Sequence, residues 1–206
     1  MDKILLPKKY LSWSQLSCWD TNPTRYRREY FECGRKLDTK YLRFGKNIAK
    51  LIEEGKHKEL IPDLVVYDSP EFKIETDILG VPVLSFIDSY NSKDNVFYEY
   101  KTGIVPWDRQ RVIKHGQLVF YATALKHSIG KIPEYCDLVW IETKEGKADI
   151  PVDDFWRENE KMVNLTGRVL NFHREFDERE IEKMENQIVK VAYEISEAYK
   201  KFIEEI

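Results

Sequence analysis

Two runs of aromatic and β-branched residues, joined by a short polar segment, constrain the fold more than any other part of the chain. The first run spans residues 81–90 (VPVLSFIDSY) and the second spans residues 96–101 (VFYEYK). Residues 91–95 between them (NSKDN) are a cluster of turn-forming residues. This pattern predicts a β-hairpin, so the end of the first strand and the start of the second should meet across the pair.

The predicted hairpin brings charged side chains together. Because side chains alternate along a strand, Glu99 and Lys101 should point to one face, and Tyr98 and Tyr100 to the other. Asp88 lies near the end of the neighbouring strand and can meet Glu99 across the pair. Two carboxylates and one amine would then converge at one edge of the sheet.

Two converging carboxylates repel each other unless a cation lies between them. A hard divalent ion such as Mg²⁺ or Mn²⁺ takes oxygen ligands, typically one or two carboxylates with water and substrate phosphate. Such an ion lowers the pKa of bound water and neutralises charge on a phosphoryl group. A lysine beside it can orient the attacking water and stabilise the phosphate. The chemistry that this set of residues favours is hydrolysis of a phosphodiester.

A structural alternative exists, because Glu-x-Lys occurs by chance in a chain of which 33% is charged, and on a strand it can be a plain solvated face. The surrounding sequence favours a site. A strand that ends in an aspartate precedes Glu-x-Lys-Thr-Gly, and a predicted helix follows in which Gln117 and Tyr121 lie four residues apart and face the same side.

These motifs resemble the PD-(D/E)XK nuclease superfamily, specifically its RecB-like exonuclease branch. That branch shows G-x-x-D, (D/E)-x-K-T-G and Q-L-x-x-Y, and the chain has SFID at 85–88, EYKTG at 99–103 and QLVFY at 117–121. An opening S-x-S-x-L pattern is matched by residues 12–16. The resemblance covers roughly residues 11–138. It implies an α/β fold with a central mixed sheet of four or five strands flanked by helices, and long C-terminal helices.

The resemblance also implies a metal-dependent deoxyribonuclease, most plainly an exonuclease that acts at DNA ends in recombination, repair or phage DNA metabolism. Its implied metal ligands for Mg²⁺ or Mn²⁺ are Asp88 and Glu99, with the Tyr100 carbonyl as a third. Lys101 would position or activate the attacking water, and Gln117 would orient Lys101 or the scissile phosphate. The implied catalytic residues are therefore Asp88, Glu99, Lys101, Gln117 and Tyr121, the last lining the site.

The chain departs from the family pattern at two positions. Ala49 stands where relatives often have a metal-binding histidine, and Ser85 stands where they have glycine. Glu53 lies one helical turn beyond Ala49 and can supply a metal ligand directly or through water, or it can be a surface glutamate. The departures keep open a nucleic-acid-binding or assembly module with weak or no hydrolysis, and an endonuclease is a further alternative.

DNA is the expected partner, although the net charge of −3 is not typical of a nucleic-acid binder. Residues 24–46 hold eight Lys or Arg against three acids, with aromatic residues interleaved. Basic groups contact phosphates and aromatics stack on bases, whereas the alternative is a solvated amphipathic helix with its aromatics in the core. The candidate DNA-binding residues are Arg25, Arg27, Arg28, Arg109, Arg111 and Lys114.

The length of 206 residues and 42% hydrophobic content predict one domain over residues 1–206, with a basic helical segment at 11–56, a catalytic core at 71–152 and helices at 153–206. Further strands are expected at 71–79, 134–143 and 148–152. Helices are expected at about 12–20, 22–33, 44–54, 107–126, 153–175 and 177–206. His57, in the charged segment 54–59, is expected to be exposed.

Three scattered cysteines indicate reduced thiols in a cytoplasmic protein, and they argue against the iron–sulfur cluster that some relatives carry. The chain has no run of eighteen apolar residues, so no membrane span is expected. It also lacks a G-x-x-x-x-G-K-S/T sequence, so any helicase activity must come from a partner. A helicase, recombinase or single-strand-binding protein is a candidate partner, and an oligomer is compatible with the sequence.

Overall fold

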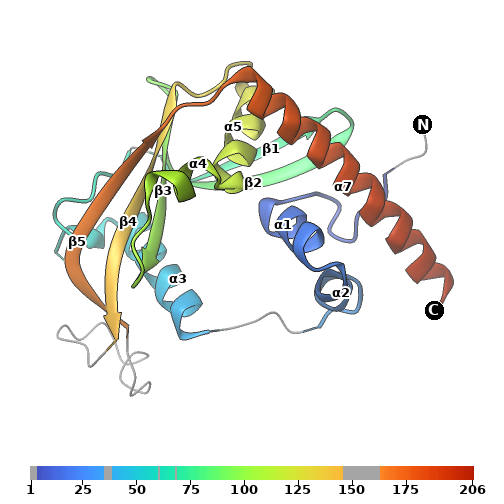
Figure 1. The fold of residues 1–206 in the computed structure, drawn as a ribbon, viewed down its shortest axis with the longest axis horizontal. Coiled ribbons are helices and arrows are strands. Elements are labelled where there is room, and N and C mark those ends of the chain that lie inside the picture. The colour runs from blue at the N-terminus through green and yellow to red at the C-terminus, as the bar shows by residue number, and fades with distance from the viewer. Residues whose placement is uncertain (1–3, 35–38, 60, 68, 146–162) are drawn as a thin grey trace.

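A computed structural model describes residues 4–34, 39–59, 61–67, 69–145 and 163–206 (Figure 1). The helices are α1 (Trp13–Thr21), α2 (Pro23–Tyr26), a π-helical turn (Arg27–Phe31), α3 (Lys40–Glu53), a 3₁₀ turn (Lys56–Glu59), α4 (Arg109–Ile113), α5 (Gly116–Ile129) and α7 (Glu178–Glu204). The strands are β1 (Ser69–Ile78), β2 (Val81–Asn91), β3 (Val96–Gly103), β4 (Tyr135–Glu145) and β5 (Val163–Arg174).

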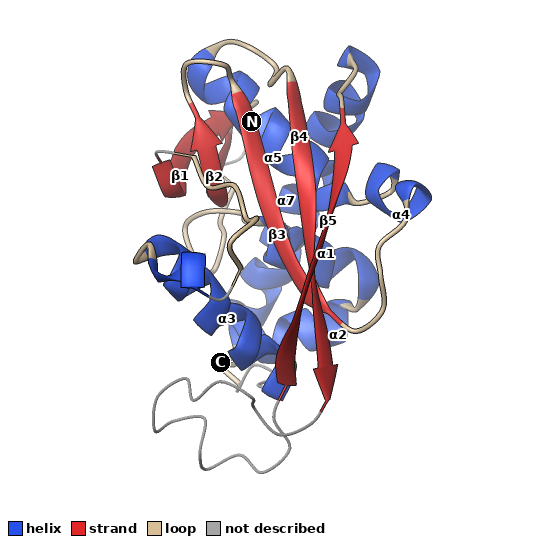
Figure 2. Ribbon diagram, turned by 90° about the vertical axis from the view of Figure 1, so that its left-hand side faces the viewer, coloured by secondary structure: helices blue, strands red, loops and turns tan. Residues whose placement is uncertain are grey.

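The five strands form one mixed sheet in the order β1-β2-β3-β4-β5. β3 and β4 are parallel, and every other neighbouring pair is antiparallel. The crossover from β3 to the parallel β4 runs through α4 and α5, as parallel pairing requires a long connection. Figure 2 shows β3, β4 and β5 side by side as long strands. The predicted α/β fold with a mixed sheet of four or five strands and a long C-terminal helix is confirmed.

Helices cover the sheet on both faces. On one face α5 packs against β1 and β2, and α7 packs on α5 and α1. On the other face α3 lies against β3, where Phe44, Ile48 and Ile52 bury themselves against Val139 and Ile141 of β4. The alternation predicted for β3 is confirmed, since Tyr98 and Tyr100 pack beside the α3 cluster while Glu99 and Lys101 are hydrogen-bonded to each other.

The β2–β3 hairpin separates soon after its turn. β2 pairs with β1 along almost its whole length, from Val81 to Tyr90, but it pairs with β3 only over Ser89, Tyr90 and Asn91. The unpaired stretch of β2 leaves backbone groups that need partners. The N-terminal segment supplies some of them, because the Leu11 N–H donates to the Pro82 carbonyl (2.8 Å) and the Leu11 carbonyl accepts from Leu84 N–H (3.0 Å). The start of α1 is thereby fixed beside β2.

The last helix, α7, follows its predicted pattern. Asp177 caps it and forms a reciprocal capping box with Glu180. Apolar residues at helical spacing lie in the core, with Ile181, Ile188 and Ile195 fully buried. Near its C-terminal end α7 also holds the π-helical turn in place, since the ring of Phe31 lies 5.0 Å from that of Tyr199 and 5.4 Å from that of Phe202, centroid to centroid.

The predicted helix at 153–175 is wrong in its described part. Residues 163–174 form the edge strand β5, which pairs antiparallel with β4. Gly167 has a φ of +85°, outside the helical region, close to a register shift between Ile141 and Thr143 of β4. A glycine among β-branched and aromatic residues was the signal for a bulged strand. The predicted strand at 148–152 and the start of that helix lie outside the described residues.

The single helix predicted at 107–126 is two helices. α4 ends at Ile113 and α5 begins at Gly116, because His115 has an extended backbone with φ −78° and ψ 96°. The buried Arg174 of β5 lies against this break. Its guanidinium donates to the carbonyls of Val112 (3.1 Å) and His115 (3.3 Å), which also accept the backbone N–H groups of His115 and Leu118 respectively.

Two smaller expectations also change. α3 begins at Lys40, earlier than the predicted residue 44, and Thr39 caps it by accepting a hydrogen bond from Leu42 N–H. His57 is 4% exposed, so the expectation that it is exposed is wrong. In the part of the chain that the structure describes, no helix combines the length and apolarity that crossing a membrane requires.

Candidate active site

Asp88 lies at the point where β2 and β3 separate. The strand register would next pair Asp88 with Glu99, but the ladder stops at Ser89 and Tyr98. Instead, the Asp88 carboxylate accepts a hydrogen bond from the Tyr100 backbone N–H at 2.8 Å. A side chain thus replaces a backbone partner at this position, which opens the hairpin and holds the carboxylate beside β3.

A chain of hydrogen bonds connects β3 to α5. Lys101 Nζ donates to Glu99 Oε1 and to Gln117 Oε1, the latter at 2.9 Å. Gln117 Nε2 in turn donates to the Tyr121 hydroxyl at 2.7 Å. The structure therefore brings these four residues and Asp88 together in one region. Its geometry depends on the break before α5, which sets where Gln117 begins the helix.

The electrostatics of the site follow from burial and like charge. The pKa of Asp88 is raised well above its usual value, first because burial disfavours the charged carboxylate and then because of the negative charge of Glu99. Burial alone would lower the pKa of Lys101, but the charges of Glu99 and Asp88 outweigh it and the pKa is raised. Lys101 is therefore a charged ammonium at neutral pH, and it is the cation that two nearby carboxylates require.

A small pocket beside Asp88 brings in two more acids. Asp88 and Tyr100 line it from the sheet, Ala49 and Glu53 line it from α3, and Glu71 lines it from the start of β1. Glu53 therefore lies in the same pocket as Asp88, where a shared ion could reach both. Glu71 was missed, although it opens a predicted strand that runs antiparallel to β2. The fold brings it near because the β1–β2 register places that strand end close to Asp88.

The donor set suits a hard divalent ion that keeps water and phosphate ligands. Among the described residues, no three His, Cys, Asp or Glu side chains gather closely enough to form a ready-made metal cage. Two carboxylates with several exchangeable ligands are nevertheless the usual arrangement for Mg²⁺. Glu99 is 2% exposed and its Oε2 is buried with no hydrogen-bond partner among the described groups. A buried carboxylate oxygen without a partner is costly, and a cation would satisfy it.

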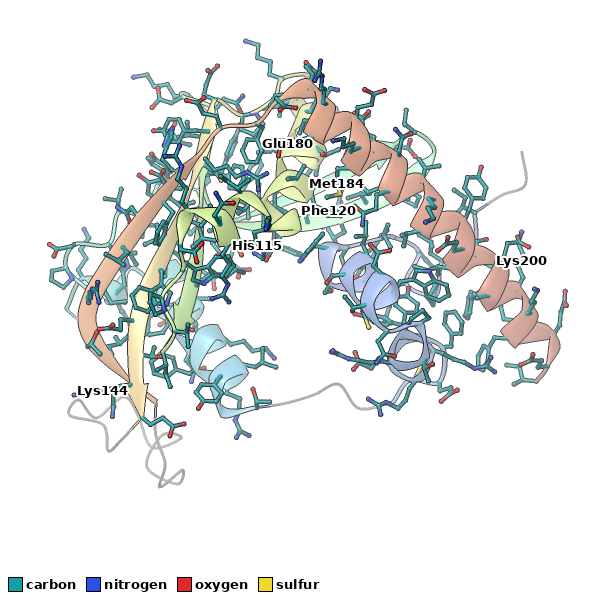
Figure 3. The ribbon with its side chains drawn as sticks, viewed as in Figure 1. His115, Phe120, Lys144, Glu180, Met184 and Lys200 are labelled. Carbon is teal, nitrogen blue, oxygen red and sulfur yellow. The ribbon has the colours of Figure 1, made fainter. Side chains whose placement is uncertain are left out.

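His115 also lies next to the site, and no sequence motif selects it. Figure 3 labels His115, the residue before α5, and Phe120, in the N-terminal half of that helix. The Trp13 ring contacts both, with centroid distances of 6.4 and 6.0 Å. Burial and then the charge of Lys101 lower the pKa of His115 to about 4, so its imidazole is neutral at physiological pH. Its ring packs against those of Trp13 and Trp107, the latter at a centroid distance of 4.8 Å.

The predicted DNA-binding arginines of the N-terminal segment differ in their surroundings. Arg25 pairs with the buried Glu29 at 2.7 Å. Arg27 pairs with Glu205 of the C-terminus at 2.9 Å and lies over the Phe202 ring. Arg28 is exposed and forms no ion pair with another described residue. Binding of phosphate by Arg25 or Arg27 would compete with an existing ion pair, whereas Arg28 is available.

The second predicted basic group lies between β3 and α5. Arg109, Arg111 and Lys114 are exposed and make no ion pair within the described ranges. The Arg111 guanidinium lies 3.9 Å from the centroid of the Trp107 ring, which restricts its position. These three residues are on α4 or directly after it, and α4 follows the strand that carries Glu99 and Lys101. Their positive charge is thus close to the site in the chain.

Comparisons with known proteins support the fold. No protein-family model matches the chain, and no curated protein sequence does. Among solved structures, an alkaline exonuclease from Laribacter hongkongensis is similar with a TM-score of 0.52 and 13% identity, covering 96% of this chain and 93% of that one. Its complex with dAMP gives a TM-score of 0.51 at 13% identity, covering 97% and 94%. A candidate exonuclease from Eubacterium rectale gives 0.54 at 11% identity, covering 91% and 83%. At these identities the likeness shows a shared fold.

Proposed function

We propose that this protein is a divalent-metal-dependent deoxyribonuclease, and specifically an exonuclease that removes nucleotides from DNA ends. The observation that carries this proposal is the convergence of Asp88, Glu99 and Lys101 where β2 and β3 separate, with Gln117 bound to the lysine. Solved exonucleases have the same fold, which supports a nuclease. The carboxylates, the lysine and the amide together are the set that hydrolysis of a phosphodiester requires.

In this proposal Asp88 and Glu99 hold the ion, together with the Tyr100 carbonyl. Glu53 and Glu71 line the adjoining pocket and would contribute through water or directly. A bound Mg²⁺ or Mn²⁺ would lower the pKa of the attacking water and would place positive charge beside the phosphoryl oxygens. Glu53 would then partly replace the histidine that is missing at Ala49.

Lys101 positions the nucleophile. An ammonium group has three protons, and Lys101 uses two of them, one toward Glu99 Oε1 and one toward Gln117 Oε1. The remaining N–H is available to bind the attacking water or a phosphate oxygen. Gln117 is oriented by Tyr121, so the lysine is held in one direction before substrate binds. Preorganised groups of this kind stabilise charge in the transition state without reorganising during the reaction.

DNA is the proposed substrate, with Arg28, Arg109, Arg111 and Lys114 contacting phosphates and Arg25 and Arg27 contributing less. Laribacter hongkongensis exonuclease was solved with dAMP, a deoxynucleotide, which supports a DNA substrate for this fold. We place the activity in the cytoplasm, where the three cysteines would be free thiols. A helicase, recombinase or single-strand-binding protein is the kind of partner that an enzyme acting on DNA ends would have.

The decisive experiment digests a linear duplex labelled at either end, and a closed circle, with Mg²⁺, Mn²⁺ or EDTA. We expect the linear duplex to be digested only when metal is present, and the closed circle to stay intact. The end whose label is released first identifies the polarity of the exonuclease. Lys101→Ala and Asp88→Ala should each lower the cleavage rate by about 10²–10⁴-fold, the usual contribution of a positioned catalytic group. Lys58→Ala, at an exposed lysine of the 3₁₀ turn, serves as the control and should retain full activity.

Each other outcome leads to a defined alternative. A wild-type cleavage rate in Lys101→Ala would show that Lys101 is not a catalytic residue and that the site is assigned wrongly. Nicking of the closed circle would make the protein an endonuclease. If no DNA is cleaved in any metal while DNA is still bound, a nucleic-acid-binding module with the nuclease fold would be the correct conclusion.

A further inference from the structure

A second pocket opens beside Gln117, the residue that accepts a hydrogen bond from Lys101. It has a volume of about 300 Å³, at the small end of the range of about 300–1,000 Å³ that is usual for small-molecule sites. Three segments form it, namely the start of α1 with Trp13, the unpaired part of β2 with Ser85 and Phe86, and the first turns of α5 with Gln117 and Tyr121. The pocket exists because the N-terminal segment pairs with the free edge of β2.

The lining of this pocket is aromatic and polar but carries no formal charge. Trp13, Tyr10 and Phe86 offer rings, and hydroxyl groups come from serines of both α1 and β2. Ser85 is 3% exposed, and its Oγ is buried without a hydrogen-bond partner among the described groups. An unpaired buried hydroxyl in the wall of a pocket indicates a polar ligand. Rings and neutral hydrogen-bonding groups together suit a nucleoside better than a phosphate.

The pocket is directly connected to the reacting groups. Gln117 lines it and also accepts the hydrogen bond from Lys101 Nζ at 2.9 Å. A group in the pocket that touches Gln117 is therefore separated from Lys101 by one carboxamide. This spacing fits a nucleoside in the pocket whose phosphate lies beside Lys101.

Trp13 is a rigid wall rather than an adaptable surface ring. It packs on His115 and Phe120, and it lies so close to Gly116 that a Cβ there would come within 2.5 Å of the ring. A fixed aromatic face costs little entropy when a base stacks on it. Phe86 is 44% exposed, so its ring is accessible to a ligand in the pocket.

We propose that this pocket holds the base and sugar of the terminal nucleotide, with the base against Trp13 and Phe86, while the scissile phosphate lies beside Lys101. The pocket has room for one nucleoside, so each cleavage releases a mononucleotide. Because its lining is uncharged, the strand end needs no terminal phosphate for recognition. This inference rests on the proposed nuclease function, whose substrate end it defines.

The test combines kinetics on a duplex of short length with binding of deoxyadenosine to the metal-free protein. Phe86→Ala should raise the KM by about tenfold and leave kcat within about twofold, since base–aromatic stacking contributes to binding in the ground state and transition state alike. Gly116→Ala, which displaces Trp13, should raise the KM in the same direction. Trp19→Ala removes a tryptophan from the same helix outside the pocket and should leave the KM unchanged.

The wild-type products should be mononucleotides. DNA ends that carry a hydroxyl and DNA ends that carry a phosphate should be cleaved with kcat/KM values within about threefold of each other. That ratio corresponds to less free energy than a hydrogen bond to a charged group contributes. An unchanged KM in Phe86→Ala would overturn the proposal. So would products of two or more nucleotides, or a decrease of more than about tenfold in kcat/KM when the terminal phosphate is removed.

Failure of the nuclease function has a different signature. If wild-type protein cleaves no DNA in any metal, the proposed function fails. The binding of deoxyadenosine then tests by itself whether the pocket holds a nucleoside. Saturation of wild-type protein by deoxyadenosine, weakened about tenfold in Phe86→Ala, would retain the nucleoside pocket. Absence of deoxyadenosine binding, or equal binding by Phe86→Ala, would remove it.

Discussion

Asp88 is a half-buried carboxylate whose charge is unfavourable in the folded protein. Its pKa is raised above the unfolded value of 3.8 by burial and by Glu99. Between the two pKa values the folded protein therefore binds more protons than the unfolded chain, so the stability that Asp88 contributes rises as the pH falls through this window and is lost as the pH rises through the folded pKa. A divalent ion would reverse this effect, because it binds the charged form.

The consequence at the residue scale is that Asp88→Asn stabilises the metal-free protein at neutral pH. Asparagine keeps an oxygen that can accept the Tyr100 N–H but carries no charge. We expect a gain of about 1 kcal/mol, or about 2–4 °C in Tm for a chain of this size, after allowance for solvent screening. Calorimetry in EDTA between pH 4 and 8 would measure it, with the exposed Asp63→Asn as the control.

The same variant gives a second, opposite readout with metal. Mn²⁺ should raise the Tm of the wild type but not that of Asp88→Asn. A lower Tm for Asp88→Asn than for the wild type in EDTA would contradict the assignment of a destabilising charge at this position.

At the scale of elements, β5 contacts the break between α4 and α5 through one buried side chain. Arg174 is 5% exposed and joins three parts of the fold, donating to the carbonyls of Val112 and His115 and to Glu180 Oε1 at 2.8 Å. Each of these carbonyls also accepts a backbone N–H, Val112 from His115 and His115 from Leu118, so the guanidinium is an additional donor that ties β5 to the break between α4 and α5. The start of α5 carries Gln117, so we expect Arg174, which makes no contact with the proposed catalytic groups, to help position the amide that accepts from Lys101.

Arg174→Lys tests this connection. Lysine keeps the charge but cannot span three acceptors with a planar fork, so it cannot replace all the hydrogen bonds by which Arg174 joins the break to Glu180. We expect a decrease of about 2–4 kcal/mol in the free energy of unfolding, measured with urea, and a reduced kcat. Arg168→Lys in the same strand, at an exposed arginine, is the matched control. Wild-type kcat in a folded Arg174→Lys protein would show that the break does not position Gln117.

At the scale of the whole molecule, a net charge of −3 means that DNA can be held only by local positive charge. The structure divides the predicted basic residues into two groups. Arg109, Arg111 and Lys114 are exposed on the segment that follows β3, whereas Arg25 and Arg27 already pair with Glu29 and Glu205. Phosphate binding by the second group must first break an ion pair, so its net contribution should be smaller.

Salt titration of DNA binding distinguishes these groups. The triple variant Arg109→Ala, Arg111→Ala, Lys114→Ala should weaken binding and reduce the slope of log K against log salt by about 1 for each phosphate that is no longer neutralised. Arg25→Ala with Arg27→Ala should change the slope less, although it should lower the Tm by leaving the buried Glu29 unpaired. A larger change of slope in the double variant than in the triple variant would place the DNA on the N-terminal segment.

The hairpin and its charged residues were predictable because they depend on local pattern. Alternation along residues 96–101 places Glu99 and Lys101 on one face whatever the rest of the fold does. The spacing of Gln117 and Tyr121 and the capping of α7 by Asp177 are equally local. Candidate site residues on short stretches of regular structure were therefore identified from the chain alone.

Other features depend on contacts between segments that are distant in the chain. Glu71 reaches the pocket beside Asp88 only through the register of β1 on β2, and Trp13 reaches the second pocket only because Leu11 pairs with the free edge of β2. The break at His115 is stabilised by Arg174, which lies 59 residues later in the chain. The sequence by itself determined which side chains a strand or helix presents. Only the tertiary structure decided which of them meet, because long-range packing and pairing select one register and one chain path among many that local preferences allow.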